Sequence, residues 1–211
     1  MDASAWDERY AGADLVWSAT PNAVVADLLG VLPPGRVLDV AAGEGRNAIW
    51  LASRGWDVLA TDFSAVAVER MRQLAGAALG PHAARLTCAV ADATRPPPGA
   101  GTAYDVVLFC FLQLPVEPWR AALAAGVGAC RPGGRVVVVL HARANLDGGY
   151  GGPRDPAVLH DPEDVRTAAA ELPVEVEVCE LRRRSVETPD GRREALDTVA
   201  VLRRSLPAGR P

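Results

Sequence analysis

The sequence predicts an α/β fold, a doubly wound and mostly parallel seven-stranded sheet whose last strand runs antiparallel. Short apolar segments typical of strands alternate with segments of helical periodicity at least five times, which indicates a parallel sheet with helices on both faces. Residues 104–110 form a continuous apolar run, as expected for a strand buried on both faces. Two further strand-like segments, residues 174–186 and 195–203, flank a Thr-Pro-Asp-Gly turn and predict a terminal hairpin.

The composition excludes several classes of protein. The 211 residues are 49% hydrophobic with a net charge of −4, which favours one domain with a sizeable core over a disordered chain or a nucleic-acid-binding polycation. All 22 basic residues are arginine, so a Schiff-base lysine and a Gly-Lys-Ser/Thr phosphate loop are excluded. The four cysteines are widely spaced and only three histidines occur, so no metal site is expected. Without a signal-peptide pattern or an apolar run of membrane length, the expected location is the cytoplasm.

Residues 1–35 are predicted as a helical cap that precedes the first strand, residues 36–204 as the main domain and residues 205–211 as a tail. In the cap, Thr20 is the expected N-cap of a helix with Pro21 in its first turn. The cap also carries aromatic residues among charged ones. They either pack the cap onto the sheet or close over a ligand.

The most informative segment is residues 36–47. An apolar run predicts a buried strand, and apolar residues at helical spacing after residue 47 predict a helix. Gly43 and Gly45 between them predict a tight turn where a ligand approaches the bare backbone. The helix N-terminus suits an anionic or polar ligand. Asp62, which follows the second strand, is expected within reach of a ribose.

The other elements follow from the same signals. Ser64 and Asp161 are expected helix N-caps, and residues 141–156 are expected to form a long glycine-rich loop. Strands are predicted at residues 57–61, 85–90 and 135–140, and helices at residues 65–78, 119–129 and from Pro162 onward.

Several of these features together resemble the class I S-adenosylmethionine-dependent methyltransferases. They are Val37-Leu-Asp-Val-Ala-Ala-Gly-Glu-Gly45, Asp62, Asp92-Ala93, the strand 104–110 and Arg131-Pro-Gly-Gly134. The terminal hairpin agrees, since the sheet of that family has an antiparallel seventh strand. The resemblance spans roughly Trp6 to Arg204. It implies a Rossmann-like fold and methyl transfer from S-adenosyl-L-methionine to a small-molecule acceptor, with S-adenosyl-L-homocysteine as product. A nucleic-acid partner is not expected, because Cys110-Phe-Leu-Gln113 stands where an Asn/Asp-Pro-Pro-Tyr/Phe motif would follow the fourth strand and no basic stripe occurs. A membrane partner is not expected either, and the expected state is a monomer or homodimer.

A narrower resemblance is to the tellurite-resistance and thiopurine-type branch of small bacterial methyltransferases. It is carried by Gly43-Glu-Gly-Arg-Asn-Ala-Ile-Trp-Leu-Ala-Ser-Arg-Gly-Trp-Asp-Val58, by Trp6-Asp-Glu-Arg-Tyr10 and by Glu180-Leu-Arg-Arg183. Members of that branch often carry a histidine beside the arginine, where this sequence has Arg182. The branch implies a soft nucleophile, a thiol or a chalcogen oxyanion, which needs little help from a base.

The class I resemblance also implies a cofactor site. Asp39 would lie near the methionine amino group, with the backbone of Gly43 and Gly45 along the methionyl part, while Asp62 would accept from the ribose and Asp92 from the adenine amino group. Ala93 would donate its amide to the adenine ring, Phe63 would pack on it, and Arg46 would bind the methionine carboxylate. The remaining expected cofactor-binding residues are Arg9, Tyr10, Trp17, Ala41, Asn47, Ser64 and Phe109. Structural alternatives stay open: a turn cap for Asp39 or Asp92, and a core position for Phe63 or Phe109.

The expected catalytic residues are His141, Arg143 and Arg182. His141 and Arg143 follow the fifth strand at the carboxyl edge, where ligands of such folds bind, and His141 is the best candidate for a base. A structural histidine and a solvated edge arginine are the alternatives. Residues 147–153, with Tyr150, have the composition of a lid, and equally of a flexible surface loop.

Two other functions remain open at this point. Gly43-x-Gly45-x-x-Ala48 also fits a nicotinamide-dependent oxidoreductase, although the terminal hairpin disfavours it. The chain is otherwise compatible with a non-catalytic protein that has kept a cofactor pocket.

Overall fold

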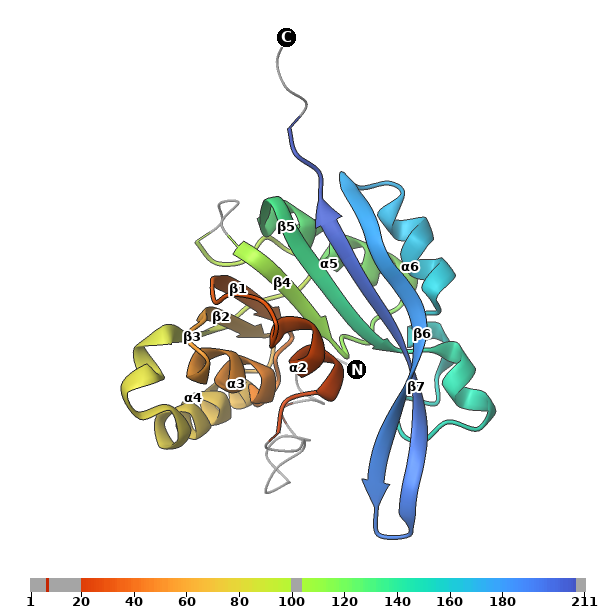
Figure 1. Cartoon of the computed structure of the whole chain (residues 1–211), viewed down its shortest axis with the longest axis horizontal. Coiled ribbons are helices and arrows are strands. Elements are labelled where there is room, and N and C mark those ends of the chain that lie inside the picture. Colours follow the sequence, from red (N-terminus) through yellow and green to blue (C-terminus); the bar gives the residue numbers. More distant parts are fainter. Residues whose placement is uncertain (1–6, 8–19, 100–103, 208–211) are drawn as a thin grey trace.

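The computed structural model describes residues 7, 20–99 and 104–207, and every structural statement below refers to these residues. They form a seven-stranded sheet in the order β3-β2-β1-β4-β5-β7-β6 with helices on both faces (Figure 1). The predicted α/β fold class is therefore confirmed. The strands are β1 Arg36–Val40, β2 Asp57–Asp62, β3 Leu86–Val90, β4 Tyr104–Cys110, β5 Cys130–His141, β6 Val174–Thr188 and β7 Gly191–Arg204.

One strand, β7, runs opposite to the other six strands of the sheet. The pairs β1–β2, β2–β3, β1–β4 and β4–β5 are parallel, whereas β7 runs antiparallel to both β5 and β6. The predicted hairpin is confirmed, and its arms are longer than expected. The helices are α2 Ala23–Leu29, α3 Arg46–Ser53, α4 Ala65–Leu79, α5 Val116–Ala129 and α6 Pro162–Ala169, with short 3₁₀ helices η1 Gly80–Arg85, η2 Arg143–Asp147 and η3 Pro156–Val158.

Two of three expected helix caps are confirmed. The Ser64 hydroxyl accepts the Ala67 N–H at the start of α4, and Asp161 forms a capping box with Asp164 at the start of α6. The expected Thr20 cap of α2 is wrong. The N-cap is Asn22, whose side chain accepts the N–H groups of the first turn. An asparagine caps at least as well as a threonine, so the helix starts two residues later than the sequence suggested.

Strand β5 extends through Pro132-Gly133-Gly134, which the sequence placed before the strand. The pairing with β4 shifts register between Tyr104 and Val106 at this point. A Cβ atom on Gly134 would lie 2.7 Å from Cys130 Sγ and 2.8 Å from the Asp105 carbonyl oxygen. Only a glycine fits at this position. Gly134 therefore lets the pairing of β5 with β4 continue through a segment whose composition is typical of a loop.

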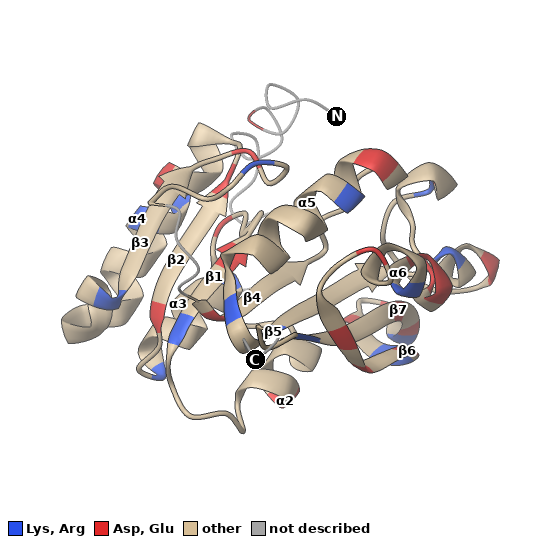
Figure 2. Cartoon of the chain, turned by 90° about the horizontal axis from the view of Figure 1, so that it is seen from above, with Lys and Arg blue, Asp and Glu red and all other residues tan. Residues whose placement is uncertain are grey.

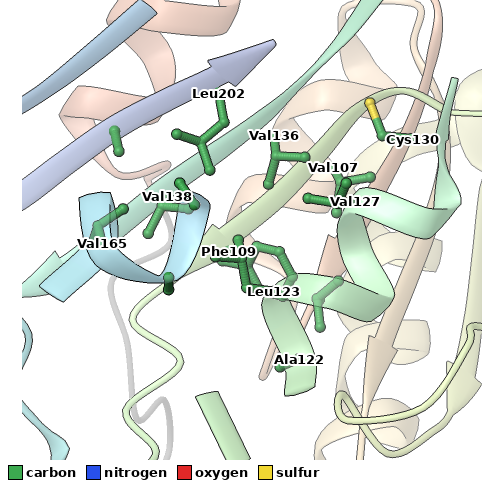
Figure 3. Packing of buried hydrophobic residues seen from close by; sticks show 14 of the residues in the cluster. Val107, Phe109, Ala122, Leu123, Val127, Cys130, Val136, Val138, Val165 and Leu202 are labelled. Carbon is green, nitrogen blue, oxygen red and sulfur yellow. The ribbon is translucent and has the colours of Figure 1, made fainter. Parts of the chain in front are cut away.

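A separate hydrophobic cluster packs on each face of the sheet. Helices α2, α3 and α4 cover one cluster, which includes Leu51 and Met71, while α5 and α6 cover the other (Figure 3), which includes Phe109 and Leu123. Successive strand residues point to opposite faces, so each buried strand supplies both clusters. Full burial of each such side chain stabilises the fold by about 1.5–3 kcal/mol.

The chain order places a crevice at the carboxyl edge of the sheet. Strands β1 and β4 are neighbours, while the chain proceeds from β1 toward β3 on one side and from β4 toward β5 on the other. Ligands of open α/β sheets bind at such a switch point. No helix of the described residues is both long and apolar enough to cross a membrane.

Candidate active site

Both edges of the crevice carry a residue in the left-handed backbone region. Ala41, which follows β1, has φ 56°, and Phe111, which follows β4, has φ 65°. This conformation is uncommon for residues other than glycine and costs on the order of 1–3 kcal/mol. Such strain persists only where the surrounding structure fixes it, and it is typical of ligand sites.

The glycine turn brings the start of α3 close to α4. Gly43 and Gly45 have φ values of 59° and 83°, and a Cβ atom on Gly45 would lie 2.3 Å from Cγ of Met71. Gly45 is thus required both by its backbone conformation and by packing. Gly43 directs its N–H toward the end of β2 and donates it to Asp62 Oδ2 at 2.9 Å.

Asp62 is a buried carboxylate that backbone N–H groups orient. Its Oδ1 accepts the Ser64 N–H at 3.0 Å, while the Ser64 hydroxyl donates to Asp7. Burial raises the pKa of Asp62, the N–H groups of Ser64, Gly43 and Phe63 oppose that rise, and the Asp7 carboxylate adds to it. A carboxylate offers about four acceptor positions, so Asp62 can still accept from two hydroxyl groups.

Asp39 is the most unusual group of the site. It is 1% exposed, and neither of its oxygens has a hydrogen-bond partner among the described residues. Burial raises its pKa to about 7, the Arg46 charge and the Ala48 N–H oppose that rise, and Asp62 adds to it. A buried carboxylate without a partner is costly, and its retention beside a glycine turn points to a ligand with N–H donors.

Asp92 and Ala93 line a shallow pocket together with Val40, Thr61 and Gly126. Asp92 also caps a turn: its Oδ1 accepts the Thr94 N–H at 2.9 Å and the Thr94 hydroxyl at 2.8 Å. These hydrogen bonds lower the pKa of Asp92. Asp92 therefore caps a turn, as one of the two interpretations of the sequence expected. Its position in the pocket is also compatible with the expected role in binding a ligand.

Of four other residues expected to bind the cofactor, three have structural roles and one is partly exposed. Asn47 Oδ1 accepts the Asn22 N–H at 2.9 Å and so joins α3 to α2, and Ser64 caps α4. Phe109 packs in the core on the α5 side, whereas Phe63 is 38% exposed. Arg9, Tyr10 and Trp17 lie outside the described residues.

On the other side of the crevice, strands β5, β6 and β7 and the end of β4 bring together a group that we call the His141 cluster: His141, Arg184, Asp197 and Phe111. His141 Nδ1 lies 3.2 Å from Asp197 Oδ1, and the Asp197 side chain is fully buried. Arg184 donates from Nε to Asp197 Oδ2 at 2.6 Å. The His141 ring stacks on Phe111 with centroids 4.3 Å apart and planes 12° from parallel.

The Phe111 ring connects this cluster to the glycine turn. The Arg184 guanidinium lies 5.3 Å from the ring centroid, and that of Arg46, the first residue of α3, lies 5.9 Å from it. Electrostatic effects of Arg46, Asp39 and Asp197 all reach the Cys110 thiol, whose pKa burial raises to about 12. The two halves of the crevice are therefore close neighbours.

The sequence identified His141 but not the other three members of the cluster. A signal for Asp197 was present, since it is a lone carboxylate at the start of the apolar run Thr198–Leu202. The expected catalytic Arg143 instead binds Asp161 Oδ2 at 2.8 Å and Asp164 Oδ2 at 3.0 Å. Arg182 pairs with Glu180 at 2.7 Å. The arginine that reaches Asp197 is Arg184, two residues farther along β6.

The expected lid loop packs against His141. A Cβ atom on Gly152 would lie 2.9 Å from Cγ and Cδ2 of His141. Asn145 holds the loop, since its Nδ2 donates to the Gly151 carbonyl at 2.9 Å and its Oδ1 accepts the Leu196 N–H at 2.8 Å. The His141 ring is therefore enclosed by Phe111 and by the loop backbone.

Comparison with known proteins links residues 37–134 to a family model described as a methyltransferase domain. The chain is 35% identical over 127 residues to demethylmenaquinone methyltransferase of Beutenbergia cavernae, covering 60% of this chain and 48% of that protein. It is also 35% identical over 108 residues to tRNA 5-carboxymethoxyuridine methyltransferase of Escherichia coli K12, covering 50% of this chain and 40% of that one. The chain thus spans about half the length of the curated relatives it matches.

Similar solved structures cover more of the chain at lower identity. A protein that converts a disulfide bond into a thioacetal group during echinomycin biosynthesis has a TM-score of 0.78 and 21% identity, covering 98% of this chain and 93% of that one. Magnesium protoporphyrin IX methyltransferase of Synechocystis PCC 6803, with S-adenosylhomocysteine bound, has a TM-score of 0.66 and 20% identity, covering 96% and 94%. TehB of Haemophilus influenzae has a TM-score of 0.67 and 17% identity, covering 88% and 63%. These likenesses show the fold.

Proposed function

We propose that this chain, which has the class I methyltransferase fold and matches a methyltransferase domain over residues 37–134, transfers a methyl group from S-adenosylmethionine to a small-molecule nucleophile. The observation that carries the proposal is the buried and unpartnered Asp39 carboxylate beside the Gly43–Gly45 turn. S-adenosylmethionine carries an ammonium group with N–H donors, which is the partner that this carboxylate lacks.

The other residues of the crevice fit the remaining parts of the cofactor. Asp62 has unused acceptor positions for two ribose hydroxyls. The pocket at Asp92 and Ala93 would take the adenine. Arg46, at the N-terminus of α3, would bind the methionyl carboxylate, where the helix dipole adds to its charge.

When bound, the cofactor supplies a methyl group on a positively charged sulfur that leaves readily. The protein therefore contributes mainly alignment of the acceptor with that methyl group, which is worth about 7–11 kcal/mol at best. The Cys110 thiol does not act as an intermediate nucleophile at neutral pH, because burial raises its pKa to about 12.

The acceptor is proposed as a small molecule. Curated relatives are named for a demethylmenaquinone and for a modified tRNA uridine, so relatives differ in acceptor. Arginines are interspersed with acidic residues over the described part of the chain (Figure 2), and this distribution does not favour a nucleic acid. A thiol or chalcogen oxyanion, as in the tellurite-resistance branch, is the narrower hypothesis, and the TehB likeness supports it through the fold alone.

Isothermal titration calorimetry with S-adenosylhomocysteine tests the proposal. We expect micromolar affinity in the wild-type protein and a loss of at least tenfold in Asp62→Asn, because one ribose acceptor oxygen becomes a donor. Asp57→Asn is the matched control: Asp57 begins the strand that Asp62 ends, and it pairs with Arg85 at 2.7 Å. Absence of binding heat with both S-adenosylmethionine and S-adenosylhomocysteine would contradict the function, and equal affinities in the two variants would contradict the site.

A further inference from the structure

The His141 ring is held in one orientation from three sides. Phe111 stacks on it at 4.3 Å, the Gly152 backbone lies against it, and Asp197 Oδ1 lies 3.2 Å from its Nδ1. A carboxylate accepts hydrogen bonds, so Nδ1 carries the proton and the lone pair of the neutral ring is on Nε2.

Among the described residues, the hydrogen bond of the His141 ring is the one at Nδ1, and none is found at Nε2. The His141 side chain is 11% exposed. A fixed ring with one nitrogen free of hydrogen bonds is the arrangement of a general base.

The buried Asp197 side chain has Arg184 as its second partner. Arg184 Nε donates to Oδ2 at 2.6 Å while His141 occupies Oδ1. Both oxygens of the fully buried carboxylate are thereby used. The adjacent Arg182 pairs with Glu180 instead, so the sequence supplies a matched arginine without this contact.

The cluster lies beside the proposed cofactor site. Phe111, the strained residue after β4, contacts His141 on one side and has the Arg46 guanidinium 5.9 Å from its ring centroid. Arg46 belongs to the same helix start as the glycine turn. An acceptor held at the His141 Nε2 atom would therefore lie at the end of the crevice opposite Asp62.

The geometry points to a specific role: His141 Nε2 is the general base of the acceptor site, with Asp197 and Arg184 as positioning residues, and the acceptor is a hydroxyl compound such as a phenol or enol. This inference rests on the proposed methyltransferase function. Nε2 removes the acceptor proton and the acceptor oxygen forms its bond to the methyl carbon. The sulfur–methyl bond breaks with its electron pair left on sulfur, which becomes a neutral thioether, and water later takes the proton from Nε2.

A chalcogen oxyanion has no proton to lose, and a thiol loses its proton near neutral pH without much help, since its ordinary pKa is about 8.5. A phenol, with a pKa of about 10 for tyrosine, gains more from a base. A His-Asp-Arg arrangement in which both Asp197 oxygens are paired is therefore best explained by an acceptor whose hydroxyl must be deprotonated.

The first experiment needs no acceptor. Long-range ¹H–¹⁵N correlation spectra of the protein saturated with S-adenosylhomocysteine report which His141 nitrogen carries the proton. Diethylpyrocarbonate labelling with peptide mapping reports whether that ring is reachable. We expect a proton on Nδ1, loss of this tautomer in Asp197→Asn but not in Arg182→Gln, and labelling of His141 slower than that of exposed His82 and faster than that of buried His160. A proton on Nε2, or a His141 as unreactive as His160, would overturn the inference.

The second experiment compares acceptors, using catechol as the hydroxyl probe and dithiothreitol as the thiol probe with radiolabelled S-adenosylmethionine. We expect His141→Asn to lower catechol methylation by about 10²–10⁴-fold, with a much smaller effect on dithiothreitol and none on S-adenosylhomocysteine affinity. His82→Asn is the control. Transfer to dithiothreitol but not to catechol, or equal loss with both, would contradict the role of His141. Calorimetry on the same samples separates this from failure of the proposed function, which would abolish cofactor binding in the wild-type protein.

Discussion

The Asp39 carboxylate makes the free protein sensitive to pH. Burial raises its pKa from 3.8 to about 7, so ionisation favours the unfolded chain. The stability is therefore highest below the unfolded pKa and falls as the pH rises from about 4 to about 7. At 1.36 kcal/mol per pKa unit, the penalty at pH 8 is about 4 kcal/mol, and at pH 5 it is about 1.5 kcal/mol.

Asp39→Asn removes this charge and should stabilise the ligand-free protein at pH 8 by at most about 4 kcal/mol, and by clearly less at pH 5. Urea unfolding at the two pH values measures the difference. The control is Asp105→Asn. Partial burial opposes ionisation of Asp105, but the Arg36 N–H and the Arg131 side chain more than offset this and lower its pKa. At pH values above the ordinary range of a carboxyl pKa, Asp105→Asn should therefore destabilise the protein, whereas Asp39→Asn should stabilise it.

Asp39→Asn should also weaken cofactor binding. If the ammonium of the cofactor occupies the Asp39 site, binding at pH 6 ionises the carboxylate and releases a proton in the wild-type protein but not in Asp39→Asn. Calorimetry in two buffers of different ionisation enthalpy measures that proton. A stability difference between the two proteins that is the same at pH 5 and pH 8, or binding of S-adenosylhomocysteine without proton release, would refute the reasoning.

Two further predictions concern packing and the loop after β5. Gly45→Ala should destabilise the protein by more than about 1 kcal/mol, because its φ of 83° disfavours a side chain and its Cβ would lie 2.3 Å from Met71 Cγ. Thermal unfolding of Gly45→Ala, Met71→Ala and the double variant measures this effect. Purely additive losses of stability would exclude the contact with Met71. Arg143→Gln should lower the stability by about 1–2 kcal/mol, because it removes the ion pairs to Asp161 and Asp164 at the start of α6. Arg182→Gln, which loses only the exposed pair with Glu180, should change it little, and an equal effect of the two substitutions in denaturant titrations would contradict this difference.

The sequence predicted the features that depend on near neighbours. Strand β4, the Ser64 cap and the Asp161 cap each follow from a few adjacent residues, and the structure confirms them. The start of α2 was missed because Asn22 and Thr20 are both good caps at nearly the same place. The continuation of β5 through Gly133 and Gly134 was missed because its cause is a close approach to Asp105, on a different strand.

The two halves of the crevice also differ in how well the sequence predicts them. The glycine turn and Asp62 lie within one β-α-β unit, so a short motif reveals the cofactor half. The His141 cluster joins residues up to 86 positions apart, from Phe111 to Asp197, through strand pairing that periodicity does not fix. Residues 182–184 are three adjacent arginines, of which Arg182 is the one expected from the sequence to be catalytic. Arg182 lies directly opposite Asp197 in the β6–β7 register, yet it pairs with Glu180, and Arg184, two residues farther along the strand, contacts the buried Asp197.

This difference explains why a short sequence motif indicates the cofactor more readily than the methyl acceptor. In the proposed site, the backbone of a turn shaped by two glycines would make many of the cofactor contacts, and many acceptor chemistries can be combined with such a turn. In the proposed site, side chains on or directly after β4, β5, β6 and β7 would select the acceptor. Relatives that share residues 37–134 can therefore differ in acceptor, and the side chains around His141 Nε2, which lie outside that segment except for Phe111, are the place to read it.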